Sequence, residues 1–307
     1  MPVAFISHPA CRRHQMGDGH PEQPARLDAI EELLHVRQLH DFLVHHEAPR
    51  ASVEQLMRVH PRTHVERLGA LSPAEGLVRV DPDTAMCPET FEAALRAAGA
   101  NVLATDLVVT GAVRRAFCNV RPPGHHAERA QAMGFCFFNN VAVGAAHALE
   151  HHGLERVAIL DFDVHLGNGT EDIFRGDRRV LICSSYQYPL YPGSNPGSMP
   201  GHIVNCPLPP GSGSDAFRAA VTQHWLPALE QFAPQMVFIS AGFDGHAADD
   251  LAELRLATAD YGWVTDRACE IAGRHANNRV VSTLEGGYEL SALAASAVVH
   301  IDRLMAD

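Results

Sequence analysis

The chain has 307 residues, of which 46% are hydrophobic and 20% are charged, and its formal net charge is −12 at pH 7. This length and composition are those of an ordinary globular protein with one large α/β domain. The acidic balance argues against broad nucleic-acid binding, which needs clustered Lys and Arg, and no apolar stretch is long enough to cross a membrane.

The N-terminus shows no basic leader followed by a long apolar run, so we expect no secretory signal. The seven cysteines are scattered and include no CxxC pair, which argues against a disulfide framework or a cysteine-based zinc site. Reduced thiols in the cytoplasm are the default expectation. The twenty histidines are unusual. Most stand beside charged residues and are expected to be solvated surface residues, among them His35, His40, His45, His46, His151 and His152.

Apolar runs rich in Val and Ile alternate with segments of helical pattern. The expected elements, in chain order, are helices at 24–34 and 88–110, a strand at 116–120, a helix at 139–151, strands at 157–160 and 180–183, a helix at 214–232, a strand at 236–240, a helix at 258–272, a strand at 280–284 and a helix at 290–304. Continuous apolar strands that alternate with helices indicate a parallel sheet covered on both faces. No repeat or linker divides the chain, so we predict one catalytic domain over residues 1–307.

A polar motif follows each of four expected strands: RPPGHHA after 116–120, DFDVHLGNGT after 157–160, AGFDGH after 236–240 and EGGY after 280–284. In a parallel α/β sheet these strand ends lie along one edge, where ligands bind at a topological switch point. We therefore predict that the four motifs converge on one crevice.

The motif DFDVH favours a metal site. On an extended strand Asp161, Asp163 and His165 would share one face, because side chains two residues apart point the same way. Buried charges without a partner are costly, and Asp244 adds a carboxylate at another strand end. Two carboxylates and one imidazole leave an open position on zinc, as in catalytic sites, where the metal polarises a carbonyl and activates water. The simpler alternative is a hydrogen-bonded cluster.

His125 and His126 follow two prolines and a glycine that mark a rigid turn. Beside a metal, a neutral imidazole could take a proton from water and return it to a leaving amine, while a cationic imidazole could stabilise negative charge. Asp161 and Asn168 are the candidates to orient the two rings. Tyr288 follows two glycines that let the backbone bend towards the site, and its phenol could donate to an oxyanion. A buried structural histidine and a loop-capping tyrosine are the simpler alternatives.

The motifs RPPGHHA, GFCFFNN, DFDVHLGNGT, SAGFDGH and LEGGY occur in this order. Together they resemble the histone deacetylase superfamily, which includes acetylpolyamine amidohydrolases and acetoin-utilisation proteins, and the pattern looks closest to class II-like and bacterial members. The resemblance runs from HPEQPAR at residue 20 to Tyr288. It implies an arginase-deacetylase fold, an α/β single domain with a parallel sheet of about eight strands sandwiched by helices.

The resemblance implies a single catalytic zinc ion, with the ligands Asp163, His165 and Asp244. It also implies that His126 is the general base and acid, that His125 is the electrostatic histidine, and that Asp161 and Asn168 are their partners. Tyr288 would polarise the scissile carbonyl.

The resemblance further implies a structural potassium site, formed by the side chain of Asp161, the backbone carbonyls of Asp163 and His165, and the pair Ser184 and Ser185. Phe135 and Tyr191 would be the aromatic walls of an acyl-lysine tunnel, with Gly134 between wall and substrate. Arg26 matches an arginine that lines the inner acetate-release cavity. Leu251 stands where polyamine-selective members can carry a glutamate gatekeeper, which disfavours a dedicated polyamine activity.

Several positions depart from the commonest family pattern. Asn168 replaces an aspartate of class I members, as it does in class II-like ones. Tyr191 stands where phenylalanine is more usual and adds a hydroxyl to the tunnel wall. Asp250 and Ala252 replace a proline and a glycine in the loop after the third metal ligand, which alters the expected rim.

The predicted function is zinc-dependent hydrolysis of an N-acetyl or other N-acyl amide, with release of acetate. The expected substrate is an acetylated lysine peptide or protein, or a small acetylated amine. The nearest alternative is an acetylpolyamine amidohydrolase. An arginase-like ureohydrolase would need a two-metal cluster with an Asp-x-His-x-Asp order, whereas this chain has Asp-x-Asp-x-His. A non-catalytic binding module would have lost a catalytic residue. We expect no nucleic-acid or membrane partner, and the sequence is compatible with a homo-oligomer.

Overall fold

The computed structural model describes residues 2–306 and is built on a sheet of eight strands. The strands run in the order β2-β1-β5-β10-β9-β6-β7-β8, and every neighbouring pair is parallel. Their bounds are β1 Val3–Ser7, β2 Leu43–Glu47, β5 Arg115–Cys118, β6 Val157–Asp161, β7 Val180–Gln187, β8 Ile203–Leu208, β9 Met236–Ala241 and β10 Val280–Leu284. The predicted parallel α/β fold is confirmed. A small antiparallel pair, β3 (Val78–Arg79) and β4 (Ala85–Met86), lies apart from this sheet.

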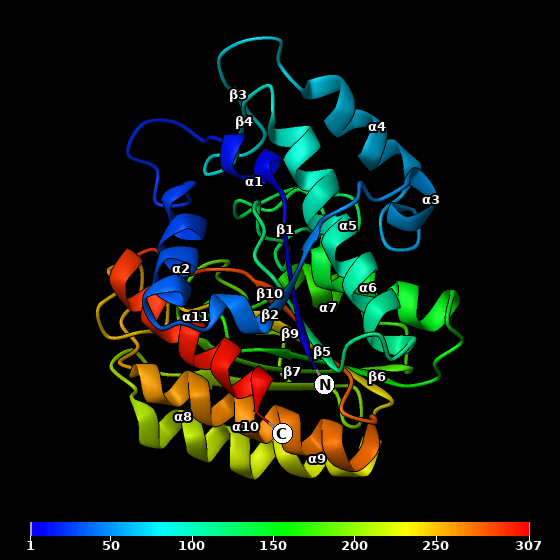
Figure 1. Cartoon of the computed structure of the whole chain (residues 1–307), viewed down its shortest axis with the longest axis vertical. Coiled ribbons are helices and arrows are strands. Elements are labelled where there is room, and N and C mark those ends of the chain that lie inside the picture. Colours follow the sequence, from blue (N-terminus) through cyan, green and yellow to red (C-terminus); the bar gives the residue numbers. More distant parts are fainter. Residues whose placement is uncertain (1, 307) are drawn as a thin grey trace.

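Helices cover the sheet on both sides. Helices α5 (Thr90–Val109) and α6 (Asn140–Glu150) contact the strands from one side, while α10 (Thr258–His275) and α11 (Leu290–Met305) also contact the sheet. In Figure 1, α8, α9 and α10 form a layer along one side of the sheet, with α5 and α6 on the other. The remaining helices are α1 (Pro9–Arg13), α2 (Ala25–Val36), α3 (Val53–Leu56), α4 (Arg62–Leu71), α7 (Asn168–Phe174), α8 (Ser214–Ala220) and α9 (Leu226–Phe232).

Burial explains which strands the sequence revealed. Every residue of β5, β6, β7, β9 and β10 is buried, as a strand covered on both faces requires. The edge strands β2 and β8 are only partly buried and contain polar residues, so they carry no continuous apolar run. We did not predict these two strands, and we also missed β1, which is an exception because its residues are almost all apolar and buried.

The predicted helix over 214–232 is divided. Helix α8 leads into a π-helical turn over Val221–Trp225, and α9 follows. Leu226 donates its backbone N–H to the carbonyl of Val221 across this turn. Pro227 has no backbone N–H and cannot donate a helical hydrogen bond. The wider π-helical turn just before it changes which carbonyls are paired, and so avoids one carbonyl without a donor.

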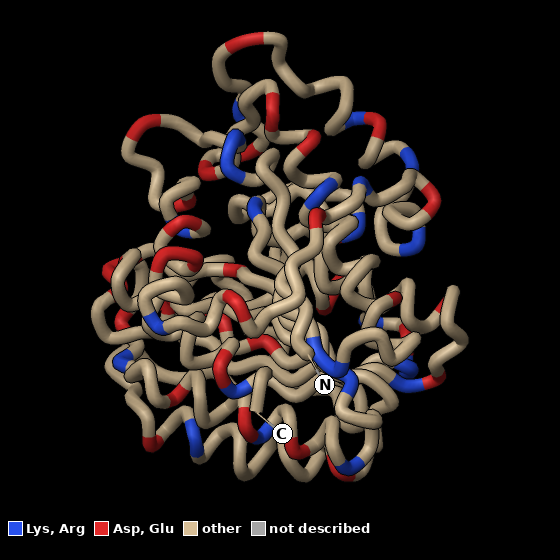
Figure 2. The backbone as a smooth tube through the Cα atoms, viewed as in Figure 1, with Lys and Arg blue, Asp and Glu red and all other residues tan. Residues whose placement is uncertain are grey.

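Acidic and basic residues are interspersed along the whole chain, as Figure 2 shows. Among the described residues, no helix is both long enough and apolar enough to span a bilayer.

Candidate active site

A cavity opens where the strands end, and all four predicted motifs contribute to it or to its immediate support. The side chains and glycines that line it are Asp83, Pro123, His125, His126, Gly134, Phe135, His165, Leu190, Tyr191, Leu251, Gly286 and Tyr288. Strands β6, β9 and β10 are neighbours in the sheet, which is why motifs far apart in sequence meet at this edge.

Asp163, His165 and Asp244 bring their potential ligand atoms within 4.8 Å of one another at the base of the cavity. Nδ1 of His165 lies 3.0 Å from Oδ1 of Asp163 and 3.3 Å from Oδ2 of Asp244. Backbone amides hold the outer carboxylate oxygens: Val164 N–H donates to Asp244 Oδ1 at 2.9 Å, and Gly286 N–H donates to Asp163 Oδ2 at 2.8 Å. Oδ2 of Asp244 is buried and accepts no hydrogen bond.

The donor set fits a divalent cation. Burial and the nearby charge of Asp163 raise the pKa of Asp244 to about 6. The protein groups around Asp244 therefore supply too little positive charge to stabilise its carboxylate form fully. Burial alone would lower the pKa of His165, yet its hydrogen bond to Asp163 and its ion-pair contact with Asp244 raise that pKa to about 9. A cation among two carboxylates and one imidazole would compensate this negative charge and leave a position open, as catalytic zinc sites do.

The prediction that Asp161, Asp163 and His165 lie on one extended strand is wrong beyond its first residue. Strand β6 ends at Asp161, and residues 162–165 form a loop. The two hydrophobic residues of this loop are still buried away from the cavity. The loop turns because Asp161 Oδ1 accepts the backbone N–H of Asp163 at 3.1 Å, and Asp163 Oδ1 accepts that of His165 at 2.9 Å.

Gly286 is required because the backbone approaches the carboxylates of Asp163 and Asp244 closely. A Cβ on this residue would lie 2.0 Å from Oδ2 of Asp244 and 2.6 Å from Oδ2 of Asp163, closer than non-bonded atoms can come. The glycine of the LEGGY motif therefore lets a backbone N–H reach Asp163.

His125 and His126 stand side by side with ring centroids 4.0 Å apart. Nδ1 of His125 donates to Asp161 Oδ2 at 3.0 Å, and Nδ1 of His126 donates to Asn168 Oδ1 at 2.8 Å. The Asn168 amide is oriented by its own Nδ2, which donates to Glu128 Oε1 at 2.8 Å. Because the proton of His126 is held on Nδ1, Nε2 of that ring keeps its lone pair.

The two histidines have opposite electrostatic character. Burial alone would lower the pKa of His125, but the carboxylates of Asp163 and Asp161 outweigh it and raise the pKa well above its usual range. For His126, burial and the positive charge of His125 lower the pKa well below its usual range. One imidazole is thus cationic and the other neutral, which suits an electrostatic role beside a proton-transfer role.

Aromatic side chains shape the entrance. Phe135 and Tyr288 face each other edge-on at 6.1 Å between centroids, and Tyr191 packs edge-on against His126 at 5.0 Å. Gly134 has a φ of +56°, and a Cβ there would lie 2.6 Å from His126 Cδ2, so only glycine fits. Leu251 is 40% exposed at the rim.

Arg26 lies behind Tyr288 and is fully buried. Its guanidinium is 5.0 Å from the centre of the Tyr288 ring, donates to the Gly287 carbonyl at 2.6 Å, and also donates to the Glu285 carbonyl. Glu22 accepts from Arg26 at 3.1 Å and pairs with Arg121. These contacts fix the backbone that carries the tyrosine.

Two supporting residues were not predicted from the sequence. Glu285 Oε2 accepts the N–H groups of Gly124 and His125 at 2.6 and 3.1 Å, so it holds the histidine turn in place. Asp249 Oδ2 accepts the N–H of Tyr288 at 2.6 Å. Glu285 stands within the LEGGY motif, which was a usable signal, whereas nothing in the local sequence marked Asp249.

Ser184 and Ser185 lie on β7 beside the loop of the metal triad. Ser184 pairs with Asp161 in the β6–β7 register. Its Oγ is buried and has no hydrogen-bond partner. Burial raises the pKa of Asp161, so this region also combines a buried carboxylate with an unsatisfied oxygen.

Comparison with known proteins identifies the family. Residues 20–304 match the model of the histone deacetylase domain. The chain is 40% identical over 293 residues to a histone deacetylase-like amidohydrolase of Pseudomonas aeruginosa, covering 93% of this chain and 77% of that protein. It is 36% identical to a probable deacetylase of Archaeoglobus fulgidus, covering 94% of this chain and 82% of the relative.

Two further comparisons extend this result. The chain is 36% identical to the human polyamine deacetylase HDAC10. This match covers 93% of the present chain but only 45% of HDAC10. The crystal structure of the HDA15 HD domain superposes with a TM-score of 0.93 at 33% identity, covering 99% of this chain and 88% of that one. The fold expected from the motifs is that of this solved structure.

Proposed function

This chain belongs to the histone deacetylase family and is a metal-dependent deacetylase, and from that premise we propose how its own residues hydrolyse an acetyl amide. The natural metal is zinc, with Asp163, His165 and Asp244 as its ligands. The buried Oδ2 of Asp244, which accepts no hydrogen bond, supports this ligand set, as does its composition of two carboxylates and one imidazole.

The observation that carries the proposal is the arrangement of His126. Its Nδ1 donates to Asn168, and its neutral ring lines the cavity beside His165. When bound, the zinc ion supplies a Lewis acid that polarises the acyl carbonyl and makes a water molecule more acidic. Nε2 of His126 takes the proton of the attacking water and later delivers it to the nitrogen of the leaving amine.

Two other groups act on the developing negative charge. Cationic His125, held by Asp161, stabilises it electrostatically. The phenol of Tyr288 donates a hydrogen bond to the oxyanion, and burial, which raises the pKa of Tyr288 well above its usual range, keeps that proton in place. Loss of one such donor typically costs about 100- to 1000-fold in kcat.

We propose an acetylated lysine side chain, or another acetylated primary amine, as the substrate. Phe135 and Tyr191 would flank its methylene chain, with Gly134 and Leu251 completing the wall, and Arg26 would line the inner cavity through which acetate leaves. The aromatic faces at the cavity entrance support this assignment, since methylene chains bury well between rings.

A potassium ion beside β7 is part of the same proposal. Asp161, the backbone carbonyls of Asp163 and His165, and the two serines would bind it. The unpartnered Oγ of Ser184 supports a ligand there. A higher melting temperature in KCl than in tetramethylammonium chloride at equal ionic strength is expected, and equal melting temperatures would contradict it.

We also propose that residues 1–307 act as one catalytic domain and that the protein works in the cytoplasm. The seven cysteines, which form no disulfide in the described chain, support that location. Cell fractionation tests it.

The experiment that tests the substrate is a turnover panel with the zinc-loaded protein. Acetyl-lysine peptides, longer acyl-lysine peptides and acetylpolyamines are compared by release of acid and free amine. The chain contains no lysine, so every lysine amine that appears comes from the substrate. We expect the highest kcat/KM on an acetylated lysine or simple acetylated amine. Preference for acetylpolyamines would move the assignment to that class, and turnover of none would contradict it.

A further inference from the structure

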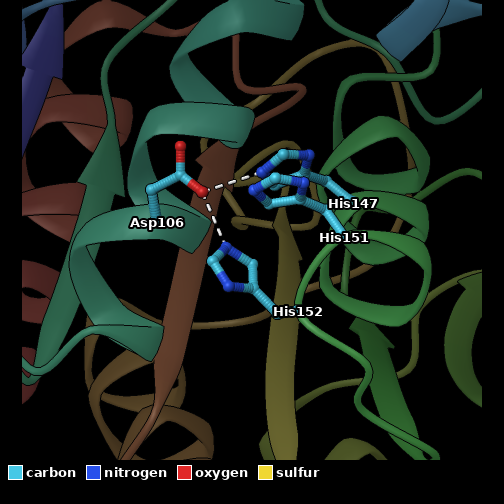
Figure 3. Close-up of side chains that lie close together, drawn as sticks. All are labelled: Asp106, His147, His151 and His152. Atoms are coloured by element: carbon cyan, nitrogen blue, oxygen red, sulfur yellow. Dashed lines mark hydrogen bonds and ion pairs between the residues drawn. The ribbon is translucent and has the colours of Figure 1, made fainter.

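A second group of potential metal ligands lies away from the catalytic cavity. Asp106, His147, His151 and His152 each offer one ligand atom, and these atoms lie within 4.8 Å of one another. Figure 3 shows the four side chains converging from α5, from α6 and from the two residues that directly follow α6. None of them lines the catalytic cavity, and the proposed deacetylase reaction does not use them.

Helical spacing brings these residues together. Asp106 lies one turn before the end of α5, and His147 and His151 are four residues apart on α6 and at its C-cap. Residues at this spacing share a helix face, and the two rings stack with centroids 4.7 Å apart and planes inclined by 17°. His152 follows and turns towards the same carboxylate. Pairing of α5 with α6 then supplies the fourth ligand.

The carboxylate is the centre of the group. Oδ1 of Asp106 accepts hydrogen bonds from Nε2 of His147 and Nε2 of His152, each at 2.7 Å. The His147 side chain is 3% exposed, whereas that of Asp106 is 42% exposed. The cluster is therefore anchored in the helix interface on one side and open to solvent on the other, so an ion can enter without unfolding.

We propose that this cluster is a structural metal site that binds one zinc-class divalent cation through three imidazole nitrogens and one carboxylate oxygen. Imidazole nitrogens favour zinc and its late first-row neighbours over magnesium or calcium. Four protein ligands close a tetrahedral shell, which is the pattern of structural sites. Tetrahedral bonds of about 2.0 Å need ligand atoms about 3.3 Å apart, so a pair at the 4.8 Å limit of the cluster would have to approach by about 1.5 Å, which a small movement of each side chain provides.

Arg58 controls the metal-free state of the cluster. Its Nη1 lies 2.5 Å from Nδ1 of His147. A guanidinium can only donate, so Nδ1 of His147 accepts and its proton is held on Nε2, facing Asp106. A metal on Nε2 requires the proton to move to Nδ1, where it would meet the Arg58 donor. The cation and Arg58 therefore compete for one ring.

The bound ion would tie the end of α5 to the end of α6. Helix α6 begins at Asn140, directly after the loop that carries Gly134 and Phe135, so the clamp lies at the opposite end of a helix that supports the cavity wall. Binding to the folded state alone raises stability by mass action. The expected effect is on melting temperature and not on the chemical step.

The test compares metal content and stability in the holoenzyme. Protein with its catalytic zinc is incubated with excess Zn²⁺, passed over a desalting column, and measured by elemental analysis and thermal unfolding. We expect two zinc ions per chain in the wild type and one in the His151→Gln/His152→Gln variant, with the zinc-dependent rise in melting temperature lost in the variant. Equal zinc content and equal melting shifts in the two proteins would overturn the proposal.

Two further variants keep the test decisive. His224→Gln/His275→Gln removes two histidines elsewhere on the surface, and it should still bind two zinc ions. Arg58→Met keeps all four ligands and removes the competing donor, because methionine has no N–H group on its side chain, so the second zinc should bind about tenfold more tightly or better. An unchanged or weaker affinity in Arg58→Met would contradict the assigned geometry even if the double variant folded poorly. Deacetylase turnover should be unchanged in all these variants, so failure here leaves the catalytic proposal intact.

Discussion

The catalytic cavity and the group formed by Asp106, His147, His151 and His152, here called the α5–α6 cluster, contain the same kinds of side chain. The two are nevertheless built in opposite ways. In the cavity, ligands come from loops after parallel strands, and two carboxylates face one imidazole. In the α5–α6 cluster, ligands come from helical spacing, and one carboxylate faces three imidazoles. The first set leaves an open position for a substrate, while the second closes a shell. In our two proposals, the number of protein ligands thus separates a site for chemistry from one for stability.

The carboxylates of the two regions also differ in electrostatic state. Burial and the charge of Asp163 raise the pKa of Asp244. Burial also acts to raise the pKa of Asp106, but hydrogen bonds from His147 and His152 outweigh it and lower that pKa. The cavity therefore contains uncompensated negative charge before a metal binds, whereas Asp106 is already satisfied. We expect the catalytic ion to bind more tightly than the ion of the α5–α6 cluster.

The largest expected effect separates the two metals. Asp244→Asn keeps the shape of the side chain but removes a charged ligand, so we expect deacetylase activity to fall about 1000-fold or more, since metal activation is worth several kcal/mol. Zinc content should fall from two to one per chain, because the α5–α6 cluster keeps its ion. Elemental analysis and steady-state kinetics measure both. Near wild-type turnover in this variant would remove Asp244 from the catalytic ligand set.

The next effect concerns the oxyanion. Tyr288→Phe deletes one hydroxyl that faces the cavity, and kcat should fall about 100- to 1000-fold. KM should change little, because the hydrogen bond forms mainly in the transition state. His151→Gln/His152→Gln is the matched control, in which kcat should be unchanged. If Tyr288→Phe raised KM and left kcat intact, the phenol would be a binding group.

A histidine outside both regions shows what burial alone does. His300 is fully buried between the hydroxyls of Thr265 and Ser282, and burial lowers its pKa to about 3. The unfolded chain, with a histidine pKa of about 6.5, takes up the proton first. The contribution of His300 to stability is therefore complete above about pH 6.5 and is lost as the pH falls towards 3, at up to about 1.4 kcal/mol per pH unit.

Urea unfolding between pH 7 and pH 4 measures this contribution. We expect the free energy of unfolding of the wild type to fall more steeply with decreasing pH than that of His300→Gln, which does not titrate. Zinc should be present at saturating concentration at each pH. Parallel slopes for the two proteins would show that His300 is not held neutral by the fold.

The smallest expected effect is at the rim. Leu251→Glu places a carboxylate at an exposed position of the cavity mouth, where it can pair with the free ammonium group of an acetylated diamine. We expect the ratio of kcat/KM for acetylpolyamine over acetyl-lysine peptide to rise about tenfold, equivalent to about 1.4 kcal/mol of surface electrostatics. Leu251→Gln is the control, and an equal change in both variants would mean that charge is not responsible.

Much of the fold was predictable because most of its central strands are continuous apolar runs, and four of these are followed by a polar motif. The edge strands β2 and β8 were not, since their half-exposed residues resemble loops. The polar residues of the cavity could be expected to meet because they follow parallel strands, whereas Gly134, Phe135, Tyr191 and Leu251 came only from the resemblance to the family. The end of β6 at Asp161 could not, because side chain to backbone hydrogen bonds decide it.

The α5–α6 cluster could not be predicted from the sequence. We expected His151 and His152 to be ordinary solvated residues, and His151 is indeed exposed. What the sequence does not show is that Asp106, 41 residues before His147, lies against them. That contact depends on the rotation of α5 against α6, which packing of the whole domain sets.

The central claim is that one metal in the cavity suffices for amide hydrolysis, and a zinc titration tests it most directly. Metal-free His151→Gln/His152→Gln protein, which retains only the cavity ligands, is titrated with Zn²⁺ while acetate release from an acetyl-lysine peptide is measured. We predict that activity rises linearly and reaches its plateau at one zinc per chain. A plateau that requires two metal ions, or full activity without added metal, would contradict the account.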